Sequence, residues 1–134
     1  MSTTASDIVA IRTGDDVVRV RQEVRAMATR AALSLVDQTK IVTAASELAR
    51  NTLDYGGGGT ARIMLLQEGA RRGVRVIFED QGPGIPDVEQ ALRDGFTTGR
   101  GLGLGLGGSK RLCNEFRIET ELGKGTRITI ARWR

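Results

Sequence analysis

Glu47 and Asn51 are a pair of polar residues whose types and spacing could do chemistry together. They stand four residues apart in a segment with helical periodicity, so their side chains project from one face. A helix could thereby deliver a carboxylate and an amide oxygen to a metal–phosphate group. One carboxamide oxygen could bind a Mg²⁺ ion that takes its other ligands from water and phosphate. The alternative is an ordinary solvated polar pair.

A turn-forming cluster, Asp80-Gln81-Gly82-Pro83-Gly84, follows an apolar run. Its glycines and proline predict a rigid turn that lets a ligand come close to the backbone. A carboxylate at the exit of an apolar strand is unfavourable to bury unless a donor meets it, and the exocyclic amine of adenine would be such a donor. The segment therefore predicts binding through Asp80, Gly82 and Gly84. The alternative is a tight turn with an exposed aspartate.

Glycines dominate residues 99–108. Backbone N–H groups that lead into a helix N-terminus form an anion site, and a nearby cation adds charge. Glycine in a helix costs about 1 kcal/mol relative to alanine, so packing alone explains this run poorly. The predicted phosphate-binding residues are Gly99, Arg100, Gly101, Leu102, Gly103, Leu104 and Gly105. Thr97 and Thr98, just before them, could act as hinge or phosphate donors, or be merely solvated.

Two common glycine motifs do not fit this run. Gly103, Gly105 and Gly108 match G-x-G-x-x-G, but a dinucleotide fingerprint follows a strand directly, and here the polar loop 95–100 comes first. The spacing from Gly103 to Gly108 also matches a P-loop. The order Ser109-Lys110 is, however, the reverse of the required Lys-Ser.

The scaffold that must position these residues can be read from hydrophobic periodicity. A helical stripe runs from Val17 to Ala31, and a second helix is predicted to be capped by Asp37 and to end at the glycines 56–59. Shorter helices are expected at 88–93 and 104–114, with a loop at 94–103. The expected strands are residues 8–12, 60–67, 74–79, 116–122 and 126–133.

The resulting element order is β-α-α-β-β-α-loop-α-β-β. It predicts an α+β fold, a two-layer sandwich with helices on one face of a mixed, mainly antiparallel sheet. We expect a single domain over residues 1–134, with residues 1–6 disordered.

Composition narrows the function classes. The net charge is +4 and aromatics make up 4% of the chain without a dense basic run, so no nucleic-acid partner is expected. Cys113 is the single cysteine, which excludes an internal disulfide. No signal peptide and no apolar run of about 20 residues is present, so we expect a cytoplasmic protein without membrane contact. No sequence feature predicts an oligomeric state.

In order, these segments resemble the GHKL (Bergerat-fold) superfamily of ATPases and kinases. Glu47-x-x-x-Asn51 is similar to its N box, and Asp80-x-Gly82-x-Gly84 to its G1 box. Residues 101–106 are similar to the G2 box that closes an ATP lid, and Gly125-Thr126 to the final G-T box. The resemblance spans residues 47–126.

The resemblance implies ATP and Mg²⁺ as cofactors and a role for each matching residue. Asn51 would coordinate Mg²⁺, and Asp80 would bind the adenine amine. Gly82 and Gly84 would let the base lie against the backbone, and Thr126 would support it through its hydroxyl group. Glu47 would be the general base that accepts a proton from the attacking hydroxyl.

Within the superfamily the chain most resembles the RsbT-type serine/threonine kinases of the bacterial stressosome, through residues 47–58 and 101–112. Histidine kinases need a phosphoacceptor histidine, and this chain has none. The resemblance implies phosphorylation of STAS-domain proteins, followed by activation of a PP2C-type phosphatase. Two alternatives remain open: an anti-sigma factor kinase that sequesters a sigma factor and phosphorylates its own antagonist, and a non-catalytic ATP-dependent binding module.

The partner surface is less determined. The first helix carries basic residues that could meet an acidic partner or simply be solvated. The predicted lid around residues 96–100 is a second candidate, because its conformation should follow the nucleotide. The basic residues of the first helix are Arg19, Arg21, Arg25 and Arg30.

Overall fold

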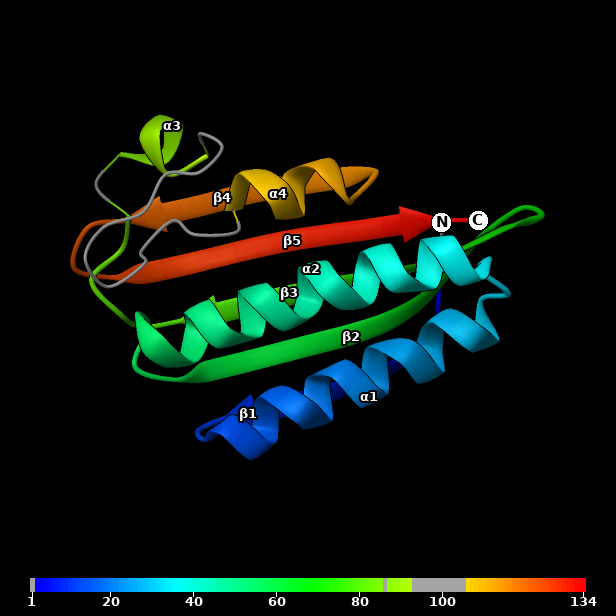
Figure 1. Ribbon diagram of the computed structural model, residues 1–134, viewed down its shortest axis with the longest axis horizontal. Coiled ribbons are helices and arrows are strands. Elements are labelled where there is room, and N and C mark those ends of the chain that lie inside the picture. Colours follow the sequence, from blue (N-terminus) through cyan, green and yellow to red (C-terminus); the bar gives the residue numbers. More distant parts are fainter. Residues whose placement is uncertain (1, 86, 93–105) are drawn as a thin grey trace.

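A computed structural model describes residues 2–85, 87–92 and 106–134 (Figure 1). The elements follow the predicted order. The strands are β1 (Ser2–Ile11), β2 (Gly59–Glu68), β3 (Arg71–Asp80), β4 (Glu115–Glu121) and β5 (Gly125–Trp133). The helices are α1 (Gly14–Arg30), α2 (Leu35–Asp54), α3 (Val88–Ala91) and α4 (Leu106–Arg111).

The five strands form one sheet in the order β1-β2-β3-β5-β4, and α1, α2 and α4 lie on the same face of it (Figure 1). This confirms the predicted α+β sandwich. Every pairing among these strands is antiparallel. The sheet is therefore fully antiparallel, whereas the sequence predicted a mixed, mainly antiparallel sheet. For β2–β3 and β4–β5 the antiparallel pairing follows from the connections, because these turns are too short for a parallel crossover.

The core lies between the helices and the covered face of the sheet. Valines of α1 and aliphatic residues of α2 recur at helical spacing and are buried. They meet alternate residues of the central strands, of which Ile63, Val76 and Ile130 are fully buried. None of the helices in the described part of the chain is long and apolar enough to cross a membrane.

Several expected boundaries are wrong, including the start of β3 at Arg71 and the end of α4 at Arg111, and two others have a local cause. The expectation of disorder over residues 1–6 fails for residues 2–6, which form the first half of β1 and pair with β2 as far as Gln67. Their side chains are mostly exposed and polar, so the alternation that reveals a half-buried strand is missing. Helix α2 begins at Leu35 and not after Asp37, because Ser34 caps it by accepting a hydrogen bond from the Asp37 N–H.

Helix α2 runs along the direction of the strands, from one end of the sheet to the other (Figure 1). Its first turn lies beside the end of β5, where Asp37 bonds to Arg132. Its last turns reach the opposite side, where β3 ends and β5 begins. One helix therefore links two ends of the molecule, which we name the distal end, at Asp37, and the cleft end, at Asn51.

Candidate functional site

An apolar cleft opens at the cleft end. Its walls are the last turns of α2, the loop after β3, the first residue of α4 and the first strand residues of β5. Its lining is mainly apolar with a few convergent polar groups, the usual character of a small-molecule site. The lining residues are Leu48, Asn51, Thr52, Tyr55, Gly56, Asp80, Pro83, Gly84, Ile85, Leu106, Thr126 and Ile128.

Asp80 is the acidic residue of this cleft. It ends β3 and is half-buried. Burial raises the pKa of its carboxyl group above the ordinary value, although backbone N–H groups of Gly82 and Thr126 act in the opposite direction. The Gly82 N–H donates to Asp80 Oδ1 over 2.9 Å. A carboxylate that is partly desolvated and bonded only to backbone amides can accept a further hydrogen bond from a ligand.

Glycines let the backbone pass close to this carboxylate. A Cβ atom at Gly56 would lie 2.5 Å from Asp80 Cγ, closer than any real contact. At Gly84, where φ is +82°, a Cβ atom would lie 2.8 Å from the carbonyl oxygen of Glu121. Side chains at these two positions would displace the Asp80 carboxylate or the loop that carries Gly84. Contacts within the protein therefore require glycine at both positions, and the approach of a ligand to this backbone stays a prediction.

Thr120 was missed by the motif analysis. Its Oγ1 accepts a hydrogen bond from the Ile85 N–H over 2.9 Å and donates to the Gly125 carbonyl oxygen over 3.2 Å. It also lies 3.0 Å from Thr126 Oγ1. Because a hydroxyl group has one proton, Thr126 is assigned as the donor in that contact. Thr120 thus joins the loop after Asp80 to the strand that carries Thr126.

The sequence held a signal for this role. Phe116, Ile118 and Thr120 alternate along β4 and share the helix-covered face of the sheet. A threonine at a position that continues an apolar series has to find partners for its hydroxyl group. Thr120 finds them at the edge of the cleft.

The structure brings together most of the predicted N-box, G1-box and G-T-box residues. Asn51 is half-buried, and it lines the cleft with Asp80, Gly84 and Thr126. Gly82 contacts Asp80 without lining the cleft itself. Glu47 is exposed on the same helix one turn before Asn51 and stands outside the lining.

The predicted lid lies outside the described residues. This applies to Thr97, Thr98, Gly99, Arg100, Gly101, Leu102, Gly103, Leu104 and Gly105. The chain is described again from Leu106, which is 2% exposed and lines the cleft at the start of α4. The stretch from residue 93 to 105 therefore connects α3 to an element of the cleft wall.

The donor set at the cleft suits Mg²⁺ bound together with a phosphate ligand. Among the described residues, no group of three His, Cys, Asp or Glu side chains could hold a metal ion alone. Mg²⁺ seldom needs such a cage, because it keeps several waters and is bound by one or two protein oxygens plus substrate phosphates. Asn51 can supply a carboxamide oxygen from the cleft wall.

Comparison with known proteins agrees with this geometry. The family model described as "Histidine kinase-, DNA gyrase B-, and HSP90-like ATPase" matches residues 36–134. The serine/threonine-protein kinase RsbT of Bacillus subtilis (strain 168) is 45% identical over 125 residues, which cover 93% of this chain and 94% of that protein.

More distant relatives are anti-sigma F factors. That of Clostridium novyi (strain NT) is 32% identical over 101 residues, covering 70% of this chain and 69% of that protein. That of Geobacillus stearothermophilus is 29% identical over 102 residues, covering 70% and 68%.

Solved structures share the fold. The RsbU and RsbW domains of a Mycobacterium tuberculosis protein superpose with a TM-score of 0.64 at 21% identity, over 98% of this chain and 33% of that one. The mycobacterial sensor histidine kinase MprB gives a TM-score of 0.55 at 19% identity, over 96% and 97%.

Proposed function

The chain belongs to the family of histidine kinase-, DNA gyrase B- and HSP90-like ATPases and is a serine/threonine-protein kinase similar to RsbT, and from that premise we propose its pathway and its site residues. It transfers the γ-phosphate of ATP to a serine or threonine of a STAS-domain protein in a stress-signalling pathway of the partner-switching kind. It then activates a PP2C-type phosphatase. Both partners act with it in the cytoplasm, the STAS-domain protein as part of a stressosome scaffold.

The observation that carries this proposal is the placement of Asp80. Its carboxyl group stands half-buried in an apolar cleft, and its pKa is raised by burial. The N–H of an adenine amine suits such an acceptor, and Leu48, Ile128 and Ile85 offer apolar surface to the base. Thr126 supports the base beside Asp80 through its hydroxyl group.

The phosphate end of the nucleotide would extend toward Asn51, and residues 97–105 are the proposed phosphate-binding residues of the sequence. Mg²⁺, when bound, neutralises phosphate charge and is held by Asn51 from the protein side. The substrate hydroxyl oxygen forms a bond to the γ-phosphorus while the bond to the β–γ bridging oxygen breaks, and ADP leaves. Glu47 takes the proton of the attacking hydroxyl group. Its exposed position outside the cleft lining suits a base that meets a second protein.

A second candidate function is an anti-sigma factor kinase. The anti-sigma F factors support it, since they are 28–32% identical over 70–84% of this chain. RsbT supports the first proposal with higher identity over 93% of the chain. The same cleft serves both, so only the bound protein distinguishes them.

A phosphate-transfer assay tests the proposal. Wild-type protein with Mg²⁺-ATP should label a STAS-domain protein encoded beside its gene. Glu47→Gln should slow transfer by about 10²- to 10⁴-fold with unchanged ATP affinity, because it removes a general base and no ATP contact. Glu68→Gln, an exposed glutamate at the far end of β2, is the matched control and should transfer like wild type.

The other outcomes are informative. Unchanged transfer by Glu47→Gln would show that this residue is not the base. ATP binding without labelling of any STAS-domain protein would indicate the non-catalytic binding module. A stable complex with a sigma factor would favour the anti-sigma function.

A further inference from the structure

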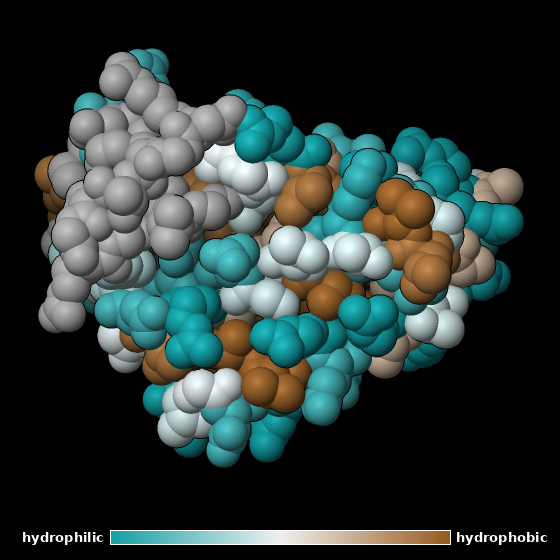
Figure 2. Space-filling model, in the orientation of Figure 1, coloured by the Kyte–Doolittle hydropathy of each residue, from teal (hydrophilic) through white to brown (hydrophobic). Residues whose placement is uncertain are grey.

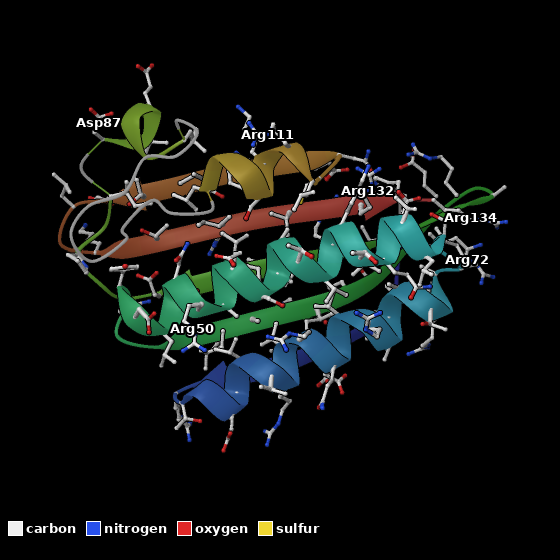
Figure 3. All side chains as sticks on the ribbon, viewed as in Figure 1. Arg50, Arg72, Asp87, Arg111, Arg132 and Arg134 are labelled. Atoms are coloured by element: carbon white, nitrogen blue, oxygen red, sulfur yellow. The ribbon has the colours of Figure 1, made fainter. Side chains whose placement is uncertain are left out.

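An apolar pair with basic neighbours occupies the distal end of the molecule. Leu35 and Val36 are 73% and 63% exposed in the first turn of α2. Arg30 ends α1 just before them, and Arg72 and Arg134 lie at the same end of the molecule (Figure 3). We name these five residues the distal surface. Figure 2 shows apolar and hydrophilic side chains side by side over this end.

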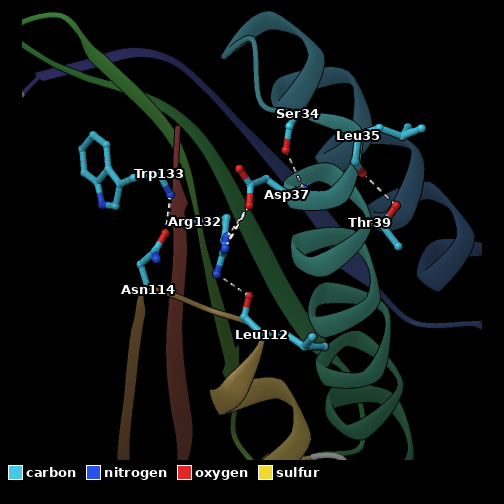
Figure 4. A network of polar contacts seen from close by, with 8 residues as sticks. All are labelled: Ser34, Leu35, Asp37, Thr39, Leu112, Asn114, Arg132 and Trp133. Carbon is cyan, nitrogen blue, oxygen red and sulfur yellow. Dashed lines mark hydrogen bonds and ion pairs between the residues drawn. The ribbon is translucent and has the colours of Figure 1, made fainter.

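The apolar pair sits on a well-ordered turn. Two residues after the end of α1, Ala32 has φ +57°, and the Leu33 N–H donates to the Ala28 carbonyl oxygen, the pattern of a Schellman cap. Ser34 then caps α2. Figure 4 shows the Leu35 side chain pointing away from the sheet while its carbonyl oxygen accepts from Thr39. The pair is therefore presented to solvent by a turn whose backbone groups are already hydrogen-bonded within the protein, so less ordering is needed when a partner binds.

The first turn of α2 is also fixed to the sheet. Arg132 of β5 donates from Nε to Asp37 Oδ1 over 3.0 Å and from Nη1 to the Leu112 carbonyl oxygen over 3.3 Å (Figure 4). These bonds connect α2, β5 and the end of α4. The network also neutralises Asp37, the carboxylate nearest to the apolar pair along the helix.

Three exposed arginines give the distal surface positive charge. Among the described residues, no carboxylate forms an ion pair with Arg30, Arg72 or Arg134. Their backbones are joined, since the Arg134 N–H donates to the Arg72 carbonyl oxygen over 2.8 Å. Arg72 in turn approaches the Arg30 carbonyl oxygen at 3.5 Å. The amino end of α2 adds partial positive charge to the same place.

We propose that the distal surface docks an acidic amphipathic segment of a partner protein, whose apolar side chains cover Leu35 and Val36 while its carboxylates face Arg30, Arg72 and Arg134. The two aliphatic side chains supply area to remove from water, and the guanidinium groups select a segment of negative charge. A desolvated apolar centre with a charged rim is the usual anatomy of a protein interface.

This inference rests on the proposed function for the identity of the partner. Leu35 and Asn51 are sixteen residues apart on α2, roughly 24 Å along a helix. A segment docked at the distal surface leaves the cleft open, whereas a phosphoacceptor must enter it. We therefore assign the distal surface to the phosphatase that the kinase activates, and not to the protein that it phosphorylates.

Two other occupants fit less well. A second copy of this chain docked through the same surface would bring the arginines of both copies together. An anionic membrane would suit the charges, but the apolar face of α2 is buried against the sheet, so the helix offers only its end to a lipid surface.

Calorimetric titration of the full chain with the PP2C-type phosphatase tests the assignment. The double variant Leu35→Ser with Val36→Ser should weaken binding at least about tenfold, and Arg72→Glu should do the same. Val18→Ser, a 42% exposed valine on α1, is the matched control and should bind like wild type. ATP affinity and phosphate transfer to the STAS-domain protein should be unchanged in every variant.

A second measurement does not depend on the natural partners. In amide NMR spectra of the full chain, a short amphipathic peptide of leucine and glutamate should shift the resonances of the distal surface, and a leucine–lysine peptide should not. The double variant should lose these shifts. If this result stands while wild type transfers no phosphate, the proposed function fails and the docking surface remains.

The proposal is overturned if the glutamate peptide shifts other regions or none, or if the double variant binds the phosphatase as tightly as wild type. It is also overturned if Leu35 and Val36 are needed for sedimentation with phosphatidylserine vesicles or for self-association of the chain. Those results would assign the surface to a membrane or to a second copy.

Discussion

Asp37 and Asp80 lie near opposite ends of α2, and the fold treats their carboxyl groups in opposite ways. Asp37 forms a charge-assisted pair with Arg132, and this hydrogen bond holds its pKa below the ordinary value. Asp80 has no cation among its described partners and accepts from backbone N–H groups, and burial raises its pKa. The first carboxylate is satisfied by the protein, and the second is left able to bind something else.

The difference shows how one helix serves two purposes. At the distal end the network of α2, β5 and α4 fixes the position of the helix relative to the sheet. At the cleft end glycines replace side chains, and polar groups converge on an apolar hollow. The bonds at the distal end fix the start of α2, and the glycines at the cleft end leave the cleft open, so the two ends of the helix have separate roles.

Replacement of Asp80 tests the role assigned to the carboxylate at the cleft end and should give the largest effect. Asp80→Asn turns one acceptor oxygen into an amide donor, which opposes the adenine amine. We expect ATP affinity to fall by about 2–4 kcal/mol, roughly 30- to 1,000-fold. Titration of ATP by calorimetry measures this. The thermal midpoint without ATP should not fall, because the substitution removes a carboxylate that burial destabilises.

Asp37→Asn is the matched control for this variant, since it changes the same atoms at the other end of α2. It should bind ATP like wild type. If Asp80→Asn also binds ATP normally, the adenine contact assigned to Asp80 is wrong.

Thr120→Val tests whether the Thr120 hydroxyl group supports the ATP site, and its effect should be smaller. The substitution preserves shape but leaves the Ile85 N–H without its acceptor, which costs about 1–3 kcal/mol. Since that loop carries Gly84, part of this cost should appear as a roughly tenfold loss of ATP affinity. Thr120→Ser should restore the affinity because it keeps the hydroxyl group.

Thr129→Val is the control for this variant, because Thr129 lies on the face of β5 away from the helices. Equal affinity of Thr120→Val and wild type would mean that the hydroxyl network supports the fold alone.

The sequence predicted the order of elements and most of the cleft. The apolar residues of α1 recur at helical spacing, and those of β4 and β5 alternate, so these elements can be predicted from the sequence. The motif residues Asn51, Asp80 and Thr126 lie together in the cleft. Local patterns sufficed there because each motif lies at the end of a strand or helix that packs on one core.

The features that sequence reasoning missed depend on contacts between distant residues. The start of β1 at Ser2 depends on pairing with β2, and its own side chains carry no alternation. The preference of acidic residues for helix caps predicts Asp37 as a cap, whereas its carboxylate pairs with Arg132, 95 residues away. Thr120 likewise has a partner far away in the sequence, since its hydroxyl oxygen accepts a hydrogen bond from the Ile85 N–H. No local pattern specifies such partners.

Asp37→Asn tests the role assigned to the carboxylate at the distal end and should give the smallest effect, a small loss of stability. The variant loses a charge-assisted pair whose side chains are 24% and 17% exposed, so we expect a loss of about 1 kcal/mol of unfolding free energy at neutral pH. Urea unfolding of wild type and variant measures it. A midpoint equal to that of wild type would show that the network does not stabilise α2.

The pH dependence of the same measurement separates the two carboxylates. The folded-state pKa of Asp37 is depressed, so its contribution is fully present above the unfolded pKa of about 3.9 and is lost as pH falls through the folded pKa. The difference between wild type and Asp37→Asn should therefore shrink on acidification. The folded pKa of Asp80 is raised, so wild type should lose stability relative to Asp80→Asn as pH rises through that pKa. The difference in unfolding free energy between wild type and variant should change with pH in opposite directions for Asp37→Asn and Asp80→Asn. A change in the same direction would show that the fold shifts the two pKa values in the same direction.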